Sequence, residues 1–232
     1  MTLPSVLLVP GAWHKPDHFR PLIDELADLD VHTVTLTSSG DDPATLQDMH
    51  ADAEVIAQAV EAIDRPVVVV AHSYGGLPTT QGLTNTRNVR HIVFLASFQM
   101  NVGDFLLSKN PGAALLPWAQ LRQREGVEDF VEAMTPETIF FNDLDATTAS
   151  AAVAQLGYQS YASMRQPLTE TAWKTIPNTY VICEDDNAVP LFAQELMAER
   201  ADNVERLNAS HSPFISQPAA VAELIRRTLA SA

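Results

Sequence analysis

The stretch VVVVAHSYGG, residues 67–76, contains the most apolar run of the chain and, directly after it, a serine among small residues. A strand that turns sharply into a helix at a serine is the context of a nucleophile elbow, which exposes the serine oxygen at the carboxyl edge of a sheet. Because that turn is strained, the residues two before and two after the serine must be small. Here they are Ala71 and Gly75. The alternative is a serine at an ordinary helix N-cap followed by two flexible glycines.

Similar apolar runs recur on both sides of this stretch. They predict strands at residues 5–9, 31–36, 67–71, 92–96, 180–183 and, more weakly, 204–207. Runs that are apolar on both faces are typical of parallel strands covered by helices on two sides. Helical patterns lie between them, one beginning at Asp42-Pro43 and others at residues 191–200 and 219–229. The alternation predicts an α/β fold with a mostly parallel, doubly wound sheet of about six strands.

Residues 101–174 interrupt this alternation because no strand pattern occurs there. Helix-like pieces appear around residues 118–124, 127–134 and 147–156. The segment is too long for a plain loop in a compact domain, so we expect it to have a structure of its own. The sequence therefore predicts a core of residues 1–100 and 175–232, with a helical lid, residues 101–174, inserted in the same domain.

Composition restricts the partners and the compartment. The chain has 232 residues, 46% of them apolar, and a net charge of −15, which disfavours binding to nucleic acid and to acidic membranes. Its N-terminal apolar run is short and broken by prolines, so we expect neither a signal peptide nor a membrane span, and a cytoplasmic location. The single cysteine, Cys183, lies in an apolar run and is expected to be buried. The sequence is compatible with a homodimer.

A serine hydroxyl needs a base, and the base needs an acid to orient it. Of seven histidines, His211 follows the last strand candidate and precedes the last helix, so it should lie over the same sheet edge as Ser73. Three acids follow the preceding strand, and Asp186 is the best placed, with Asp185 as the second choice. A solvated acidic turn is the alternative for the acids that are not used. The order Ser73, Asp186, His211 is the chain order of α/β-hydrolases.

A serine nucleophile also needs two donors for the oxyanion that forms on its substrate. We expect the backbone N–H of Tyr74, which follows the serine, and that of Ala12, in the loop after the first strand, where Gly11 permits a tight turn. His14 and His18 are spaced four residues apart, but no third ligand accompanies them. We therefore expect no metal and no cofactor.

The segments LLVPGAW, AHSYGG, YVICEDDNAVP and ASHSPFISQP together resemble the small α/β-hydrolase family of plant hormone methyl esterases, hydroxynitrile lyases and related bacterial esterases. The resemblance implies the triad Ser73, Asp186 and His211, favours Asp186 over Asp185, and places the oxyanion donors at Ala12 and Tyr74. In two positions the chain differs from relatives. Pro10 stands where many have histidine, and Ser212 stands where the lyases have a lysine, which argues against lyase activity.

These observations together predict a serine esterase. Trp13, Phe98 and Trp118 are expected to line a pocket for a small to medium, uncharged, partly apolar carboxylic ester. Cleavage of a lactone, carbamate or amide by the same triad is a variant of this prediction. A cofactor-free lyase and a non-catalytic small-molecule receptor on a hydrolase fold are the alternatives.

Overall fold

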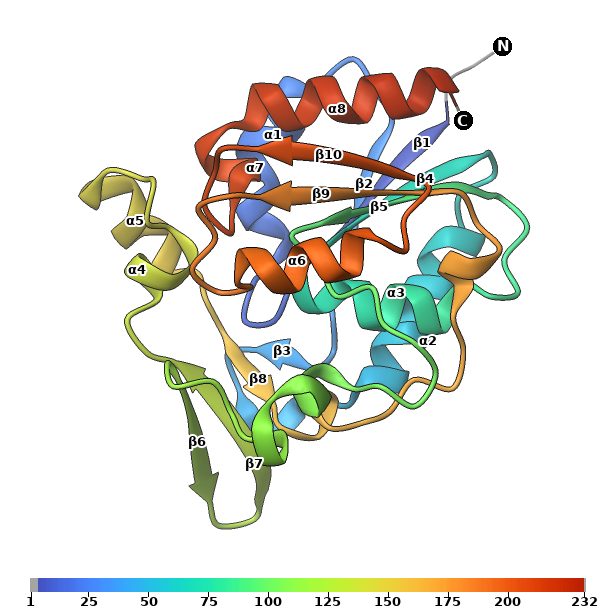
Figure 1. Ribbon diagram of the computed structural model, residues 1–232. Coiled ribbons are helices and arrows are strands. Elements are labelled where there is room, and N and C mark those ends of the chain that lie inside the picture. Colours follow the sequence, from blue (N-terminus) through green and yellow to red (C-terminus); the bar gives the residue numbers. More distant parts are fainter. Residues whose placement is uncertain (1–3, 232) are drawn as a thin grey trace.

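The apolar runs of the sequence form one central parallel sheet. The computed structural model describes residues 4–231, and its sheet has the strand order β10-β9-β5-β4-β1-β2 with every pair parallel (Figure 1). The strands are β1 (Ser5–Val9), β2 (Val31–Thr33), β4 (Val67–His72), β5 (Val89–Leu95), β9 (Asn178–Cys183) and β10 (Asn203–Leu207). The predicted α/β fold with about six strands is confirmed, although β2 ends three residues before the predicted end.

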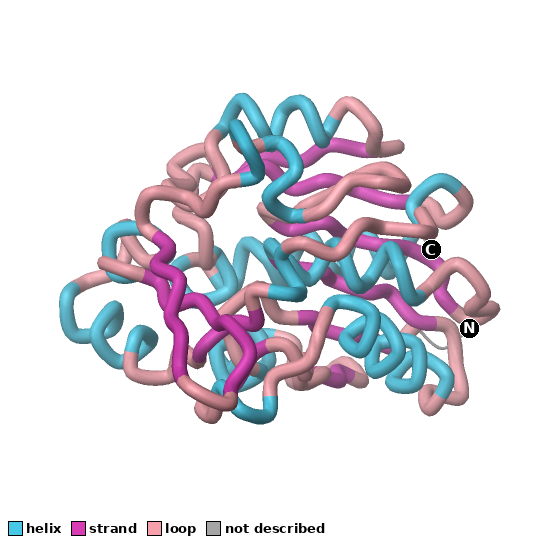
Figure 2. The backbone as a smooth tube through the Cα atoms, turned by 90° about the horizontal axis from the view of Figure 1, so that it is seen from below, coloured by secondary structure: helices cyan, strands magenta, loops and turns pink. Residues whose placement is uncertain are grey.

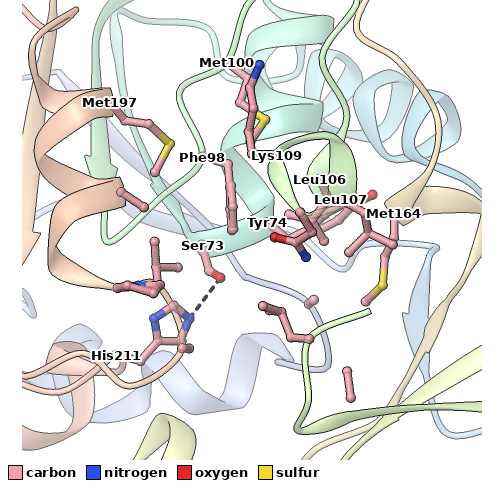
Figure 3. A pocket seen from close by; sticks show the side chains of 18 of the residues that line it. Ser73, Tyr74, Phe98, Met100, Leu106, Leu107, Lys109, Met164, Met197 and His211 are labelled. Atoms are coloured by element: carbon pink, nitrogen blue, oxygen red, sulfur yellow. Dashed lines mark hydrogen bonds between the residues drawn. The ribbon is translucent and has the colours of Figure 1, made fainter. Parts of the chain in front are cut away.

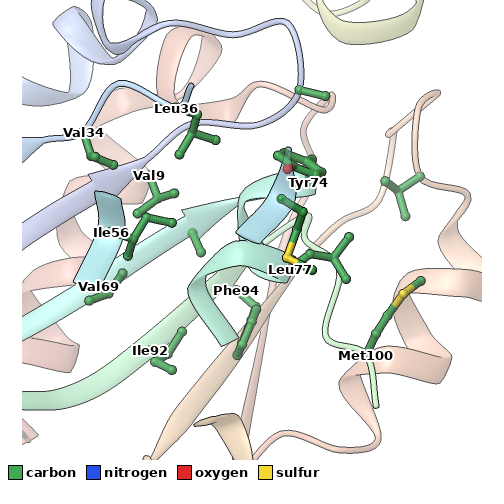
Figure 4. Packing of buried hydrophobic residues seen from close by; sticks show 14 of the residues in the cluster. Val9, Val34, Leu36, Ile56, Val69, Tyr74, Leu77, Ile92, Phe94 and Met100 are labelled. Atoms are coloured by element: carbon green, nitrogen blue, oxygen red, sulfur yellow. The ribbon is translucent and has the colours of Figure 1, made fainter. Parts of the chain in front are cut away.

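Helices cover the sheet on both faces because its strands are apolar on both faces. One face carries α1 (Arg20–Glu25), α7 (Pro213–Ser216) and α8 (Pro218–Ser231), and the other carries α2 (Met49–Glu61), α3 (Gly76–Gly82) and α6 (Leu191–Ala198) (Figure 1). In β1, Val6 and Leu8 pack on the α8 side, whereas Leu7 and Val9 pack on the α2 side. Figure 4 shows this second layer, where Ile56 and Leu77 lie over the sheet. Each such buried aliphatic side chain contributes about 1.5–3 kcal/mol.

The helix expected at Asp42-Pro43 begins later than predicted. Asp42 accepts a hydrogen bond from the N–H of Ala44 and caps only a short 3₁₀ turn, Pro43–Thr45. Leu46 is extended, so the turn cannot continue. Asp48 then caps α2 by accepting from the N–H of Ala51. The predicted start is wrong because two successive aspartates cap two separate elements, and the first has only one turn.

The inserted segment contains strands as well as helices. A second, antiparallel sheet has the order β3-β8-β7-β6 and comprises β3 (Ser39–Gly40), β8 (Tyr158–Ser160), β7 (Val127–Ala133) and β6 (Ala119–Arg124) (Figure 2). The helices predicted at residues 118–124 and 127–134 are therefore wrong. Gly126, with φ +73°, forms the hairpin turn between β6 and β7, and pairing of β7 with β8 overrides the helix propensity of this charged sequence.

Helices make up other parts of the inserted segment. The third predicted helix, at residues 147–156, is present as α5 (Ala146–Val153), which follows the short α4 (Pro136–Phe140). Short 3₁₀ turns in this segment occupy Leu106–Lys109, Pro111–Ala113, Ala162–Met164 and Ala172–Lys174, and two others lie outside it at Pro16–Phe19 and Ser73–Gly75. The division into core and lid remains a prediction.

The carboxyl ends of the parallel strands meet at one edge of the main sheet. The loops that follow β1, β4, β9 and β10 carry Ala12, Ser73, Asp186 and His211. Open α/β sheets bind ligands at this edge. Among residues 4–231, no helix combines the length and the apolar character needed to cross a membrane.

Candidate active site

Ser73 occupies a strained turn directly after β4. Its φ of +51° lies in the left-handed region, which costs a non-glycine residue about 1–3 kcal/mol unless neighbours hold it. The carbonyl oxygen of Ser73 accepts hydrogen bonds from the N–H of Phe98 at 3.1 Å and from Oγ of Ser97 at 2.8 Å. A Cβ at Gly75 would lie 2.5 Å from the carbonyl oxygen of Pro10. The sequence predicts a small residue two positions after the serine, and the structure leaves room there only for glycine.

Ser73, His211 and Asp186 form one continuous line of hydrogen bonds. Nε2 of His211 lies 2.9 Å from Oγ of Ser73 (Figure 3), and Nδ1 of His211 lies 2.7 Å from Oδ2 of Asp186. A carboxylate only accepts hydrogen bonds, so Nδ1 carries the proton and Nε2 is free to accept from the serine hydroxyl. All three residues are buried. The geometry is that of a general base placed to take a proton from Ser73.

The acidic loop offers one carboxylate to this line. Oδ1 of Asp186 accepts from the N–H groups of Ala188 at 2.7 Å and Val189 at 2.9 Å, and Nε2 of Gln194 approaches Oδ2 at 3.2 Å. These donors fix the carboxylate and leave Oδ2 directed at His211. Asp185, the second choice from sequence, is exposed. Of the two carboxylates, Asp186 is the one within hydrogen-bonding distance of His211.

The loop after β1 lies against the serine. A Cβ at Gly11 would lie 2.7 Å from Cβ of Ser73, so this position requires glycine to let the loop after β1 approach the turn after β4. The left-handed residue of the loop is instead Trp13, with φ +64°. Ala12 and Tyr74 both line the cavity beside Ser73. Among residues 4–231, no group accepts a hydrogen bond from the N–H of Ala12, so this donor is available to a ligand.

Three further histidines pack behind the line of hydrogen bonds. Nε2 of His72 donates to the carbonyl oxygen of His211 at 2.9 Å, and Nδ1 of His14 donates to the carbonyl oxygen of Ala12 at 2.9 Å. Burial lowers the pKa of His14 and of His72 well below the usual value, and burial also lowers the pKa of His18. The neutral rings of His14 and His72 support the loops of Ala12 and His211 without adding charge, whereas His18 contacts the carbonyl oxygens of Lys15 and Ala152. Among the described residues, no group of three or more His, Cys, Asp or Glu side chains is arranged to hold a metal ion.

An apolar cavity of about 350 Å³ opens over Ser73 (Figure 3). Trp13, Phe98 and Trp118, which the sequence singles out, all line it. Side chains from residues 101–174 and from α6 also line the cavity, namely Leu106, Leu107, Leu115, Leu116, Phe140, Met164, Leu196 and Met197.

Two cations reach the cavity, and each has a protein partner. Lys109 pairs with Asp104, and Arg200 donates to the carbonyl oxygen of Gln99.

Residues 101–174 also contact the loop of His211, and the sequence does not predict this contact. The ring of Phe140 lies 5.6 Å from that of His211, and Oδ2 of Asp143 accepts from the N–H of Ser210 at 2.9 Å. Asn142 and Asn187 bond across the same boundary, to the carbonyl oxygens of Asp185 and Thr138. A pair of aromatic residues at Phe140-Phe141 is the one local signal for this contact.

Comparisons with known proteins agree with this architecture. A family model described as the alpha/beta hydrolase family matches residues 6–224. The alpha/beta hydrolase nvfD of Aspergillus novofumigatus is 29% identical over 250 residues, which cover 100% of this chain and 99% of that protein. A probable hydrolase R7 of a Phoma species is 31% identical over 241 residues, covering 97% and 98%. The crystal structure of the methylesterase MES16 from Arabidopsis superposes with a TM-score of 0.81 at 18% identity, covering 98% of this chain and 100% of that one.

Proposed function

The chain belongs to the alpha/beta hydrolase family, and from that premise we propose that it is a serine esterase that cleaves a small to medium, uncharged, partly apolar carboxylic ester. The resemblance to this family that the sequence motifs indicate is confirmed. The observation that carries the proposal is the line of hydrogen bonds Ser73–His211–Asp186, which ends at the floor of an apolar cavity.

The mechanism follows from the hydrogen-bond directions. Oγ of Ser73 attacks the ester carbonyl while Nε2 of His211 takes the serine proton, and Asp186 stabilises the imidazolium that forms. The backbone N–H groups of Ala12 and Tyr74 donate to the oxyanion of the tetrahedral intermediate. His211 then protonates the leaving alcohol, and an acyl-serine remains. A water that gives its proton to His211 attacks the acyl carbon and releases the acid and free Ser73.

The cavity supports an uncharged substrate. Its lining is mostly aliphatic and aromatic, and Lys109 and Arg200 are both engaged by protein groups. A charged substrate would exchange its hydration shell for a mostly apolar lining, which costs free energy. A volume of about 350 Å³ is at the lower end of the range for small-molecule pockets, which favours a substrate of small to medium size.

Two other functions fit the fold less well. A cofactor-free lyase would use the same triad for proton transfer, but Ser212, where the resembling lyases carry a lysine, is buried and lies 3.3 Å from Nε2 of His14. A non-catalytic receptor would not need the serine, histidine and aspartate to be aligned within hydrogen-bonding distance. Lactone, carbamate and amide cleavage need the same groups as ester cleavage.

The test is covalent labelling combined with product analysis. A fluorophosphonate probe should label the wild-type protein at Ser73, and a panel of short-chain aryl esters should give the acid and the phenol in equal amounts. Ser73→Ala should abolish both labelling and turnover without changing the far-UV circular dichroism. A folded wild-type protein that is not labelled would exclude the esterase and favour the receptor.

A further inference from the structure

A buried polar network lies behind the two backbone segments that supply the proposed oxyanion donors. Asp52 on α2 is fully buried and accepts four hydrogen bonds. The donors are Oγ1 of Thr37 at 3.0 Å, the N–H of Ser38 at 2.9 Å, Oγ of Ser38, and the phenol of Tyr74 at 2.8 Å. Four donors saturate the two oxygens of a carboxylate. Asp52 thereby fixes the side chain of the residue that follows the nucleophile.

The same network continues to the loop after β1 through Gln159 on β8. Nε2 of Gln159 donates to Oγ of Ser38 at 2.8 Å and to Oγ of Ser163 at 2.7 Å. Oε1 of Gln159 accepts from the backbone N–H of Trp13 at 3.2 Å. Gln159 is fully buried, and every polar atom of its amide has a partner. The bonds run in one direction, from Trp13 through Gln159 and Ser38 to Asp52.

The strained backbone at Trp13 depends on this side of the molecule. Trp13 is a bulky residue with φ +64°, and it directly follows Ala12. Its carbonyl oxygen accepts from the N–H of Gly157 at 2.8 Å, and its indole N–H donates to the carbonyl oxygen of Val131 at 2.9 Å. With Gln159, three bonds from β7, β8 and the residue before β8 hold one left-handed residue. Because Trp13 directly follows Ala12, holding this turn restrains the backbone that carries the Ala12 N–H.

The charge states fit a network of fixed donors. Burial raises the pKa of Tyr74 well above its usual value, and the nearby Asp52 charge raises it further, so the phenol stays protonated and donates. Burial also raises the pKa of Asp52, while hydrogen bonds from Ser38 and Tyr74 oppose this shift. Figure 4 places the Tyr74 ring in the buried cluster beside Leu77. The Tyr74 side chain is thus anchored in the core while its backbone N–H lies beside Ser73.

We propose that Asp52 and Gln159 are positioning residues of the oxyanion hole, Asp52 acting through Tyr74 and Gln159 acting through Trp13. This inference rests on the proposed esterase function. Neither residue lines the cavity over Ser73. Each holds one of the two backbone segments whose N–H groups must meet the developing oxyanion, and an electrostatic site of this kind works only when its donors are fixed in advance.

Two variants remove the anchors and keep both backbone donors. Tyr74→Phe deletes only the phenol that reaches Asp52, and Gln159→Met deletes the acceptor of the Trp13 N–H. With phenyl acetate as substrate, we expect kcat to fall about 10- to 100-fold for each, with KM changed less than about threefold, because the loss concerns the transition state. The affinity for phenylboronic acid, which forms a tetrahedral adduct on serine, should fall by the same factor as kcat.

A matched control separates positioning from stability. Thr179→Val removes another buried hydroxyl, which is bonded to Nε2 of His91 at 2.9 Å. Thr179 lies near the amino end of β9, whereas the active-site loop follows its carboxyl end. Thr179→Val should lower the urea midpoint and leave kcat and boronic acid affinity unchanged. Asp52→Asn replaces one carboxylate oxygen with an NH₂ group, which would face groups that already donate to Asp52. This variant should lower kcat at least as much as Tyr74→Phe. If Asp52→Asn does not fold, Tyr74→Phe and Gln159→Met still test the positioning role.

The double variant and the wild type complete the test. If both residues serve one oxyanion hole, the fall in kcat for Tyr74→Phe with Gln159→Met should be smaller than the product of the single effects. Wild-type turnover combined with unchanged kcat and boronic acid affinity in both single variants would overturn the positioning role alone. A wild-type protein without ester turnover or fluorophosphonate labelling would instead overturn the proposed function, and the positioning role with it.

Discussion

Asp186→Asn tests the orientation of the proposed catalytic histidine, His211, with a change of one heavy atom. The N–H groups of Ala188 and Val189 both donate to Oδ1 of Asp186 at 2.7 and 2.9 Å. An asparagine must therefore place its carbonyl oxygen at the Oδ1 position and its NH₂ group at the Oδ2 position. That NH₂ group then faces Nδ1 of His211, which lies 2.7 Å from Oδ2. Two donors cannot face each other, so Nδ1 must lose its proton and Nε2 must carry it.

The expected loss follows from this tautomer. With a proton on Nε2, His211 donates to Ser73 and can no longer take the serine proton. Forcing the wrong tautomer in a serine–histidine–aspartate triad costs about 10⁴-fold in kcat, equivalent to about 5.5 kcal/mol in the barrier. The approach of Gln194 Nε2 to Oδ2 at 3.2 Å adds a second unfavourable pair of donors. We therefore expect a fall in kcat of about 10⁴-fold.

The assay is steady-state hydrolysis of phenyl acetate at pH 7.5, with the rate of fluorophosphonate labelling as a second readout. Asp185→Asn is the matched control, because Asp185 is the neighbouring acid and is exposed. It should keep kcat within about threefold of the wild type. The reasoning is wrong if Asp186→Asn retains a tenth of the wild-type kcat, or if Asp185→Asn loses activity in its place.

Three further changes test the packing, the buried histidines and the cavity. Gly75→Ala sets a methyl group 2.5 Å from the carbonyl oxygen of Pro10, so the free energy of unfolding in urea should fall by about 2 kcal/mol or more; an unchanged midpoint would contradict the close contact. Burial lowers the pKa of His72, so below about pH 6.5 the unfolded chain takes up a proton there that the folded chain does not. Stability therefore decreases as the pH falls, by about 1 kcal/mol from this group between pH 6.5 and 5.5, and His72→Gln should remove that share; equal pH dependence in both proteins would refute the assignment. Phe98→Ala should enlarge the cavity and raise kcat/KM for naphthyl acetate relative to phenyl acetate, and an unchanged ratio would show that Phe98 does not limit the substrate.

The fold could be predicted because its signals are local. All five residues of β1 are buried, as are all six of β4, so most of each strand appears in the sequence as an apolar run, interrupted only by Ser5 at one end of β1 and His72 at one end of β4. The turn at Ser73 is equally local, because its steric demands fall on residues within two positions. The hairpin of β6 and β7 gives no such signal, since the burial of Phe130 and Val131 depends on pairing with β8, about thirty residues later in the chain.

The candidate site could be predicted only in part. His211 is accessible to sequence reasoning because the strand order brings the ends of β4 and β10 to one edge. Spacing does not separate Asp185 from Asp186, since the choice depends on which carboxylate the N–H groups of Ala188 and Val189 hold. The contact of Phe140 with His211 is even harder to predict from the sequence, because about seventy residues separate the two positions in the chain.

Trp13 shows why such long-range contacts leave little trace in a sequence. Its left-handed backbone belongs to the first loop of the core, yet all three hydrogen bonds that hold it come from the inserted segment. Val131 contributes a carbonyl oxygen and Gly157 an N–H, which nearly any residue supplies. Only Gln159 contributes a side chain, so it is the one position of the three whose residue type matters for holding Trp13. Gly157 is restricted for another reason, because a Cβ there would lie 2.8 Å from the carbonyl oxygen of Gly40. Residues 101–174 thus line the cavity and also hold the loop beside Ser73 through their hydrogen bonds to Trp13.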